Sequence, residues 1–434
     1  MNRKLIFVGF AVLLVVAVGG RIRPAVVGRL YTVYFPVRSG SQPLRASLVP
    51  AAATVNTSGF ARADGPRPLR FSEDHGPHES YQTEWWYYTG NLVADSGEQF
   101  GYQLTFFRRA LVPPAERSAR TSAWGTDQVY LAHFALTDVG GPSPQHHAFE
   151  RLSRGAAGLA GGQATLFRVW LDDWSVSADG AAGAIEDGAP MALRAGADGI
   201  AIDLILRSLR PAVLNGDGGY SRKGPEPGNA SIYYSLTRIA TAGAVVVGGR
   251  SYAVHGLSWM DHEFSTSALG LDAVGWDWFS LQLVTPGAGK PSTGRRGKPS
   301  TGRRGQGQGG DAGELMAFQL RKADGSVDPF SAGTLVKPDG TSRTLGSGDF
   351  SVEVTDHWRS PNTGALYPSG WVLTVPSARA RLVVTPKLAD QEMAVSFTYW
   401  EGAVDVSGTL NGIEVAGSGY VELTGYAGSM QGQF

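Results

Sequence analysis

The chain has 434 residues, of which 42% are hydrophobic and 18% are charged, a balance typical of a folded protein with more than one core. Its 38 Lys and Arg residues equal its 38 Asp and Glu residues, so no net charge attracts nucleic acid, and we expect nucleic acid not to be a partner. The absence of Cys excludes disulfides, thiolate nucleophiles and zinc sites built on sulfur, so any metal would need His and carboxylate ligands.

The first segment has the layout of an export signal. Arg3 and Lys4 precede an uncharged apolar run at 5–20, and two arginines follow it directly. The run fits a cleaved signal peptide and equally a retained anchor, because it is nearly long enough to span a bilayer. We therefore expect residues 1–23 to direct export to the periplasm or the extracellular space. An uncleaved segment would attach the protein to the inner membrane through residues 5–20.

The segment that follows, 24–67, is rich in Pro, Ala, Ser and Thr without a sustained period, which predicts a flexible tether. Beyond it, short alternating or aromatic runs recur between Gly and Asp turns, and no equally long stretch has a helical period. This pattern predicts an all-β protein. The expected strands are 84–92, 100–108, 129–136, 200–206, 232–239, 244–247, 276–284, 315–320, 370–375, 381–384, 393–400 and 419–423.

A short internal repeat predicts two similar halves. Trp86-Tyr87-Tyr88 leads to Gly-Glu-Gln-Phe-Gly-Tyr-Gln-Leu at 97–104, and Trp278-Phe279 leads to Gly-Glu-Leu-Met-Ala-Phe-Gln-Leu at 313–320. A Trp-led strand followed by a returning hairpin in each half predicts two β-barrels or sandwiches in tandem. We place the first domain at 68–265 and the second at 266–434.

The second domain contains an unusual loop. The octamer Gly-Lys-Pro-Ser-Thr-Gly-Arg-Arg occurs at 289–296 and again at 297–304, followed by Gly and Gln. A basic, Gly-rich duplication between two strands predicts a disordered loop insertion at 286–312, which is tolerated because the cost of loop closure grows slowly with length.

Acid, imidazole and indole side chains gather between His255 and Leu283. Read as a strand, period two sends His255, Trp259, Asp261 and Glu263 to one face, and Met260, His262 and Phe264 to the other. An Asp beside indoles and another carboxyl can stay protonated and act as an acid. The alternative is a buried Asp that accepts backbone hydrogen bonds at a strand bend. Both interpretations stay open at this point.

Nearby residues argue against a serine hydrolase. The segment Gly-Leu-Ser-Trp-Met at 256–260 resembles a nucleophile elbow until its last position, where Met260 replaces the Gly that the tight turn needs.

The remaining aromatic and imidazole side chains admit two interpretations each. Trp85, Trp86 and Tyr88 can line an apolar cavity that binds substrate, or simply form a barrel wall. Tyr233 and Tyr234 can hold a water molecule, or pack with satisfied hydroxyls. Imidazoles can hold a metal, or form a turn network. His75 and His78 with Glu84 or His133 are the candidate ligands, and we expect the turn network and no metal.

Seven segments together resemble the superfamily of AttH-like proteins and carotenoid 1,2-hydratase (hydroxyneurosporene synthase). They are Asp-His-Gly at 74–76, Thr-Glu-Trp-Trp-Tyr-Tyr-Thr-Gly-Asn-Leu at 83–92, Tyr-Tyr-Ser-Leu-Thr-Arg at 233–238, Trp-Met-Asp-His-Glu at 259–263, Gly-Trp-Asp-Trp-Phe-Ser-Leu-Gln-Leu at 275–283, Tyr-Trp-Glu-Gly at 399–402 and Gly-Tyr-Val-Glu at 419–422. The resemblance runs from Leu69 to the C-terminus and implies two lipocalin-like β-barrel domains. The chain looks most like the exported branch described as secreted hydrolases.

The resemblance also implies site residues. Asp261 matches the proposed proton donor of the hydratase, and Trp259 lies where that enzyme has Tyr. Tyr233 and Ser235 lie near the positions where the hydratase has His and Trp, which is a departure.

We therefore expect acid-catalysed hydration of a C=C bond in an apolar, isoprenoid-type molecule held between two β-barrels, without a cofactor. Asp261 would supply the proton, Trp259, Trp276 and Trp278 would stabilise positive charge, and Tyr233, Tyr234 or His255 would position the water. A lyase is thus favoured over two alternatives. One is a secreted hydrolase of an ester, amide or lactone with His75, His78, His255 and His262 around a metal, and the other is a non-catalytic carrier of a hydrophobic molecule.

Overall fold

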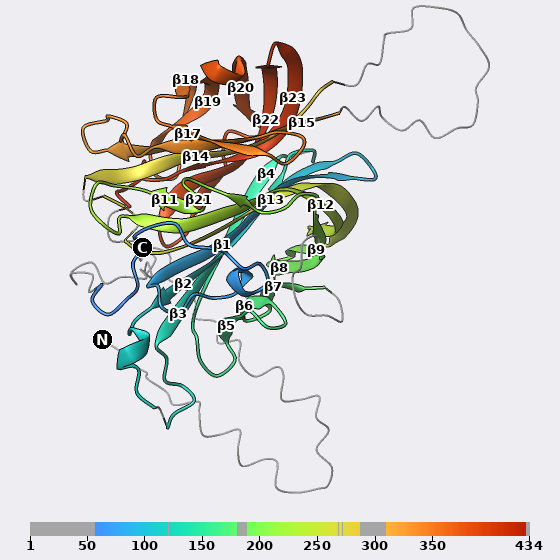
Figure 1. Ribbon diagram of the computed structural model, residues 1–434. Helices are drawn as coiled ribbons and strands as arrows, with labels where there is room; N and C mark the ends of the chain where they lie inside the picture. Colours follow the sequence, from blue (N-terminus) through green and yellow to red (C-terminus); the bar gives the residue numbers. More distant parts are fainter. Residues whose placement is uncertain are drawn as a thin grey trace, which may run out of the picture. The chain divides into compact units, whose positions relative to one another are not determined.

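The computed structural model describes residues 57–119, 121–141, 143–179, 189–267, 269–270, 272–286 and 310–430 (Figure 1). The chain divides into units 1–44 and 45–434, and every described residue belongs to the second. The predicted export segment, most of the tether and residues 287–309 of the loop insertion lie outside the described residues. None of the helices in the described part is long and apolar enough to cross a membrane.

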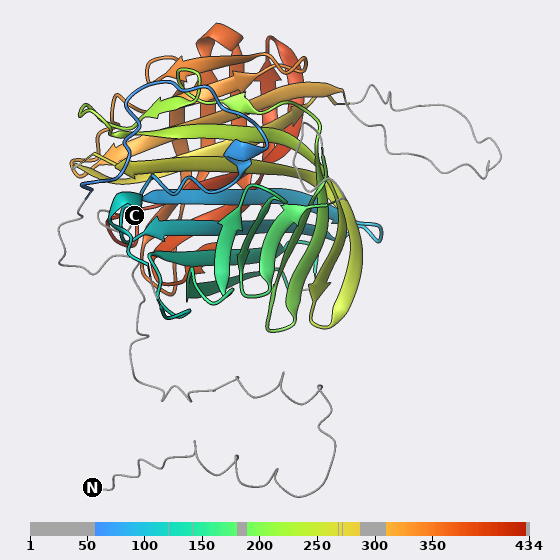
Figure 2. The same ribbon diagram turned by 60° about the horizontal axis from the view of Figure 1, so that its bottom comes forward.

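The first sheet contains thirteen antiparallel strands. They are β1 Thr83–Ala94, β2 Gln99–Ala110, β3 Gln128–Asp138, β4 Gln145–Arg154, β5 Ala160–Gln163, β6 Arg168–Leu171, β7 Trp174–Ala178, β8 Met191–Ala197, β9 Ile200–Ser208, β10 Val213–Leu214, β11 Tyr220–Arg222, β12 Ala230–Val247 and β13 Arg250–Ser267. Their order is β4-β3-β2-β1-β13-β12-β9-β8-β7-β6-β5, with β10 and β11 beside β12. The sheet curls until β4 contacts β6, which makes a near-closed barrel (Figure 2).

The second sheet contains ten strands in the order β17-β16-β15-β14-β23-β22-β20-β19-β18, with β21 beside β22. They are β14 Ala273–Val284, β15 Asp311–Lys322, β16 Ala332–Val336, β17 Ser342–Gly346, β18 Ser351–Arg359, β19 Leu366–Val375, β20 Ala380–Pro386, β21 Glu392–Ala394, β22 Thr398–Leu410 and β23 Ile413–Leu423. The helices among the described residues are three short 3-10 helices, η2 Glu73–His75, η3 Pro114–Glu116 and η4 Pro376–Ala378. The predicted all-β class with two curled antiparallel sheets is confirmed.

The two sheets share a topology, but the predicted alignment of Trp86 with Trp278 matches residues that lie on different faces. In each sheet the first strand pairs with the second and with the last, β1 with β2 and β13, and β14 with β15 and β23. Trp86 lies in the core of the first sheet, whereas Trp278 lies between the sheets. Since side chains alternate along a strand, Tyr87 is the residue that faces as Trp278 does. Short Trp-rich segments can be aligned in either register, and only the packing selects one.

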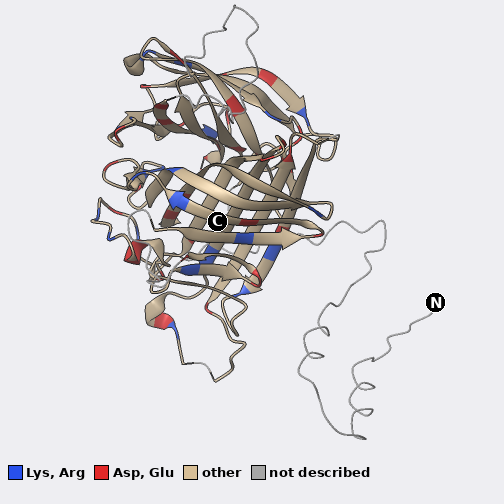
Figure 3. Ribbon diagram, turned by 90° about the vertical axis from the view of Figure 1, so that its right-hand side faces the viewer, with Lys and Arg blue, Asp and Glu red and all other residues tan. Residues whose placement is uncertain are grey.

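A layer of buried aromatic and apolar side chains joins the two sheets. Its members are Tyr87, Tyr233 and Trp259 from the first sheet, and Trp278, Met316, Phe318, Leu320, Ala403 and Tyr420 from the second. We call this group the intersheet layer. Lys and Arg are interspersed with Asp and Glu on both sheets (Figure 3).

The last residues of the predicted tether pack against the first sheet instead. Ala63 is 1% exposed and belongs to a small core that includes Ile232 and Phe264, and Ala61 packs against the same core. The composition of 24–67 shows no periodic pattern of apolar residues. Single apolar side chains at the end of such a segment can still pack on the folded domain, and composition does not reveal this.

Candidate functional site

Strand β13 carries polar groups on both of its faces, as the predicted alternation requires. Trp259, Asp261 and Glu263 point toward the second sheet, whereas Met260 and His262 point into the first barrel. The strand is therefore shared by two distinct polar clusters, one between the sheets and one inside the barrel.

Asp261 is the best-supported acid of the first cluster. Its carboxyl is 4% exposed and accepts hydrogen bonds from the Tyr233 hydroxyl at 2.6 Å, the Trp259 indole N–H at 2.7 Å and the Ser235 hydroxyl at 2.5 Å. Burial raises the pKa of Asp261 to about 7, although these three donors favour the charged form. A carboxyl in this state can hold a proton near neutral pH and release it to a substrate.

A second row of carboxyls faces Asp261 from the other sheet. On the first sheet Asp261 lies between Ser235 and Tyr87 in the strand register. On the second sheet Glu422 lies between Glu401 and Trp278. The sets are joined by hydrogen bonds from the Tyr87 hydroxyl to Glu401 at 2.6 Å and from the Trp278 indole to the Tyr233 hydroxyl at 3.1 Å. The acidic groups of the two sheets therefore face one another across the intersheet layer.

These second-sheet carboxyls are also shifted toward the protonated form. Burial raises the pKa of Glu422 to about 7, opposed by a hydrogen bond from the Trp276 indole at 3.0 Å and reinforced by the charges of Asp261 and Glu263. Burial and the charge of Glu422 hold the pKa of Glu401 well above its usual value. The cluster thus contains three carboxyls whose pKa values are raised, Asp261, Glu401 and Glu422.

The rim of the cluster is less buried than its floor. Trp85, Leu269 and Trp276 are half-buried and pack on the intersheet layer, and Glu422 is half-buried beside them. Of the residues predicted to contact substrate, Trp85, Trp276 and Trp278 lie here. The rim is therefore the partly exposed part of the cluster.

His255 is not part of this cluster, and the prediction that it helps to position water beside Asp261 is wrong. It pairs with Val93 and Ala242, its side chain is 66% exposed, and its Nδ1 lies 3.7 Å from Asp95. It does occupy the predicted face of β13, but this long strand runs past the area that the second sheet covers. Period two identifies the face of a strand and says nothing about how far a partner extends along it.

Trp86, Tyr88 and Tyr234 lie away from Asp261, inside the first barrel, and their predicted contact with substrate stays a prediction. Trp86 stacks on His262 with ring centroids 4.8 Å apart, and the Tyr88 hydroxyl lies 3.9 Å from the Met191 sulfur. These residues fill the first barrel because they occupy the alternate positions of β1 and β12.

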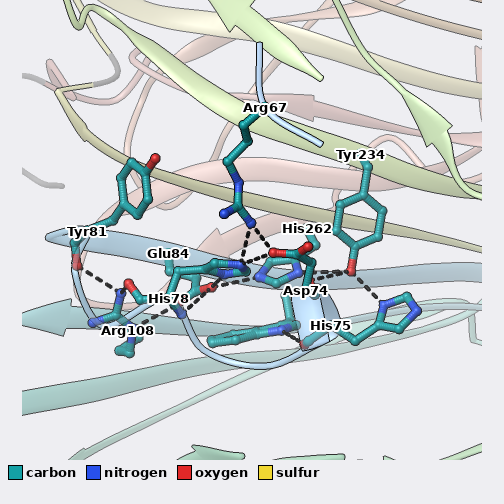
Figure 4. A network of polar contacts seen from close by, with 10 residues as sticks. Arg67, Asp74, His75, His78, Tyr81, Glu84, Arg108, Tyr234 and His262 are labelled. Atoms are coloured by element: carbon teal, nitrogen blue, oxygen red, sulfur yellow. Dashed lines mark hydrogen bonds and ion pairs between the residues drawn. The ribbon is translucent and has the colours of Figure 1, made fainter. Parts of the chain in front are cut away.

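Inside the first barrel, a polar network surrounds Glu84 (Figure 4). One oxygen of its carboxylate accepts from His78 Nδ1 at 2.7 Å and from His262 Nε2 at 2.8 Å, and the other accepts from Arg108 Nε at 2.8 Å. His78 Nε2 lies 2.8 Å from Asp74, which also pairs with Arg67. The network ties η2 and the turn after it to β1, β2 and β13.

Within the described residues, His78, Glu84 and His262 have the donor types of a metal site, with donor atoms within 4.8 Å of one another. The geometry does not fit an ion, however. Both nitrogens of His78 lie within hydrogen-bond distance of carboxylate oxygens, which favours the doubly protonated imidazolium, and this form has no lone pair for a metal. Glu84 and Asp74 raise the pKa of His78 against the effect of burial. The cluster is therefore a buried ion network.

The other imidazoles named as candidate ligands have separate partners. His75 Nδ1 lies 2.6 Å from the Tyr234 hydroxyl, and burial lowers the pKa of His75 to about 3. His133 Nδ1 lies 2.9 Å from the Tyr399 hydroxyl, and its Nε2 lies 3.1 Å from Glu150. The predicted alternative of His75, His78, His255 and His262 around one metal is contradicted by these positions, since His255 lies on the exposed part of β13.

The sequence profile of the AttH-like family matches residues 62–287 and 310–426, which is most of the chain. The chain belongs to the AttH-like family. A candidate AttH protein from Nitrosomonas europaea has a crystal structure that is 31% identical to this AttH-like chain, with a TM-score of 0.67, covering 85% of this chain and 100% of that one. Kievitone hydratase from Nectria haematococca shares the fold at 14% identity, with a TM-score of 0.58 and coverage of 84% and 97%. Curated proteins yield no match.

Sequence reasoning missed three groups of the AttH-like site, namely Tyr87, Glu401 and Glu422. Glu401 and Glu422 lie in the segments that carry the family resemblance, at 399–402 and 419–422, but nothing local gave them a role. Their alternation with apolar neighbours on β22 and β23 shows which face each occupies. That this face meets Asp261 depends on how the two sheets pack.

Proposed function

We propose that this AttH-like protein adds water across a C=C bond of an apolar, isoprenoid-type molecule held between the two sheets. The observation that carries the proposal is Asp261, a buried carboxyl with a pKa of about 7 in an aromatic layer. An isolated alkene is protonated only by an acid that keeps its proton near neutral pH, and burial among aromatic rings gives Asp261 that property.

The chemistry balances without a cofactor. The Asp261 proton forms a C–H bond with one alkene carbon, and the π electrons that make this bond leave a cation on the other carbon. The faces of Trp259 and Trp278 stabilise this cation, each by about 0.5 to 2 kcal/mol in a dry site. Water then adds to the cation, and the oxonium returns a proton to the Asp261 carboxylate. Tyr233, which donates to Asp261 and accepts from Trp278, orients the acid.

The similarity to kievitone hydratase supports the fold alone at 14% identity, so the proposal rests on the residues around Asp261. The proposal includes export directed by residues 1–23, and attachment to the membrane if 5–20 are retained. This location suits a hydrophobic substrate, because such a molecule partitions into membranes.

The test is turnover in labelled water. Lipids extracted from the exporting host are incubated with the full chain in water labelled with oxygen-18. Products that gain one labelled water are then sought by mass spectrometry. We expect such a product with the wild type, loss of at least about a hundredfold of the activity in Asp261→Asn, and a decline above about pH 7. His255→Ala, on the exposed part of β13, is the matched control with unchanged turnover.

Other outcomes separate the alternatives. Equal turnover in the wild type and in Asp261→Asn would contradict the proposal. The same unmodified ligand bound to both proteins would indicate a carrier.

A further inference from the structure

Four carboxyl groups surround the intersheet layer, and positive side chains are fewer. Asp261 and Glu263 come from β13, Glu401 from β22 and Glu422 from β23. The Lys223 ammonium lies 3.3 Å from Glu263 and 3.9 Å from the centre of the Phe318 ring. Its charge is therefore already paired with Glu263. At the end of the first sheet's face, Arg109 donates to Thr83 at 3.3 Å. The carboxyls in the middle thus carry an excess of potential negative charge.

Within this group of carboxyls, Glu401 and Glu422 form a close pair. They are directly opposite in the register of β22 and β23, where like charges destabilise a sheet. Glu401 is fully buried, and its second oxygen has no hydrogen-bond partner among the described residues. A buried carboxyl oxygen without a partner is costly, so the arrangement suits a positive group supplied from outside the chain.

The indole rings at this place have their polar atoms occupied by protein acceptors. The indole N–H groups of Trp259, Trp276 and Trp278 are all occupied by acceptors, on Asp261, Glu422 and Tyr233 respectively. The Tyr87 and Trp278 rings meet edge to face with centroids 5.1 Å apart. Ring faces carry partial negative charge, so the surfaces that remain for a ligand attract cations.

We propose that the intersheet site binds hydrophobic organic cations, of the alkylammonium class, in preference to neutral molecules of the same shape, with Glu422 as the principal counter-charge. The inference deepens the proposed function and rests on its placement of the ligand at Asp261. An alkylammonium head has the charge and shape of the carbocation that protonation of the alkene produces, so it is held by the same carboxylates and rings.

Glu422 is the principal counter-charge because of its position. It is half-buried at the rim beside Trp276, so an incoming head group meets it before the buried Asp261. Because burial and neighbouring charges raise the pKa of Glu422 to about 7, a bound cation stabilises its charged form.

The test compares decyltrimethylammonium with 1-undecanol, a neutral chain of similar length, by calorimetry and by tryptophan fluorescence. Wild-type protein is expected to bind the cation at least about tenfold more tightly than the alcohol at about pH 8. Glu422→Gln should remove most of this preference while the affinity for the alcohol is unchanged, which also shows that the variant is folded. Glu392→Gln, whose carboxyl bonds Ser360 and Thr363 instead, is the matched control and should keep the preference.

A second measurement needs no variant. The probe keeps its charge at every pH, so its affinity for the wild type should fall about fivefold or more between about pH 8 and about pH 6, and the alcohol's should not. Equal affinity for both probes, or a preference that survives Glu422→Gln, would overturn the inference. It fails separately from the proposed function, since loss of turnover in Asp261→Asn without cation preference would leave hydration standing.

Discussion

At the scale of the residue, the state of Asp261 is decided by competition between burial and hydrogen bonding. Three donors favour its carboxylate, and the low polarity of the intersheet layer favours the acid. Burial outweighs the donors, so a group suited to proton transfer is obtained at a cost in stability. Glu84 shows the opposite result with equal burial, because Arg108 and His78 lie against it and hold its pKa well below the usual value.

The cost at Asp261 is measurable as a pH-dependent change in stability. Its pKa is about 7 in the folded state and near 3.8 when unperturbed, so unfolding releases a proton between these values and the stability of the wild type falls as pH rises through them. Asp261→Asn has no proton to release. We therefore expect its melting temperature relative to the wild type to rise from about pH 4 to about pH 8, as measured by circular dichroism. A difference that is the same at both pH values would contradict the raised pKa.

The Glu84 network should behave as a buried ion cluster. Glu84→Gln leaves Arg108 and the His78 imidazolium without their shared counter-charge, and we expect a loss of about 3 to 5 kcal/mol in the free energy of unfolding, measured in urea. The lowered pKa of Glu84 means that its contribution is present above its unperturbed value of 4.5 and disappears as pH falls further. The raised pKa of His78 means that its contribution is lost as pH rises through the folded value.

The same network gives a test of the metal interpretation. A chelator should leave the melting temperature unchanged, because His78 has no free lone pair. A large decrease on chelation would show that these side chains hold an ion after all.

At the scale of the element, β12 and β13 join the two barrels. Each is a long strand that contributes one face to the first barrel and the other to the intersheet layer. A register shift in their pairing between Leu236 and Ile239 places Arg238 toward the second sheet. There Arg238 and Arg210 both pair with Glu314 of β15, which is fully buried.

This link predicts a strong effect of one substitution outside the candidate site. Glu314→Gln removes the buried one of two carboxylates that Arg210 and Arg238 share, the other being Asp311, and we expect the free energy of unfolding to fall by about 3 to 5 kcal/mol. Substitution of Asp203, which pairs with Arg194 on the exposed part of the first sheet, should cost at most about 1 kcal/mol and is the control. Similar losses for the two variants in chemical denaturation would argue against a structural role for the link.

At the scale of the whole molecule, the described residues form two sheets that share the intersheet layer. Each barrel fills its own interior with side chains, and the first adds a buried ion network. Three carboxyls with raised pKa values lie between the sheets, Asp261 of the first sheet and Glu401 and Glu422 of the second. The candidate site therefore requires both sheets.

The sequence by itself determined the features that depend on local order. Alternation and turn residues were enough for the all-β class, and period two placed Trp259, Asp261 and Glu263 together on one face of β13. The Asp beside indoles was recognisable as a candidate acid, because its neighbours along the chain already lower the polarity around it.

Only the tertiary structure decided which faces are covered, and by what. His255 has the same parity as Asp261 yet is exposed, and Trp86 has the opposite parity to Trp85 and lies inside the barrel. Glu401 and Glu422 reach Asp261 from more than a hundred residues away along the chain. Periodicity assigns a side chain to one face of its own strand, whereas burial and pKa depend on the strand opposite, whose identity follows from the packing of the two sheets.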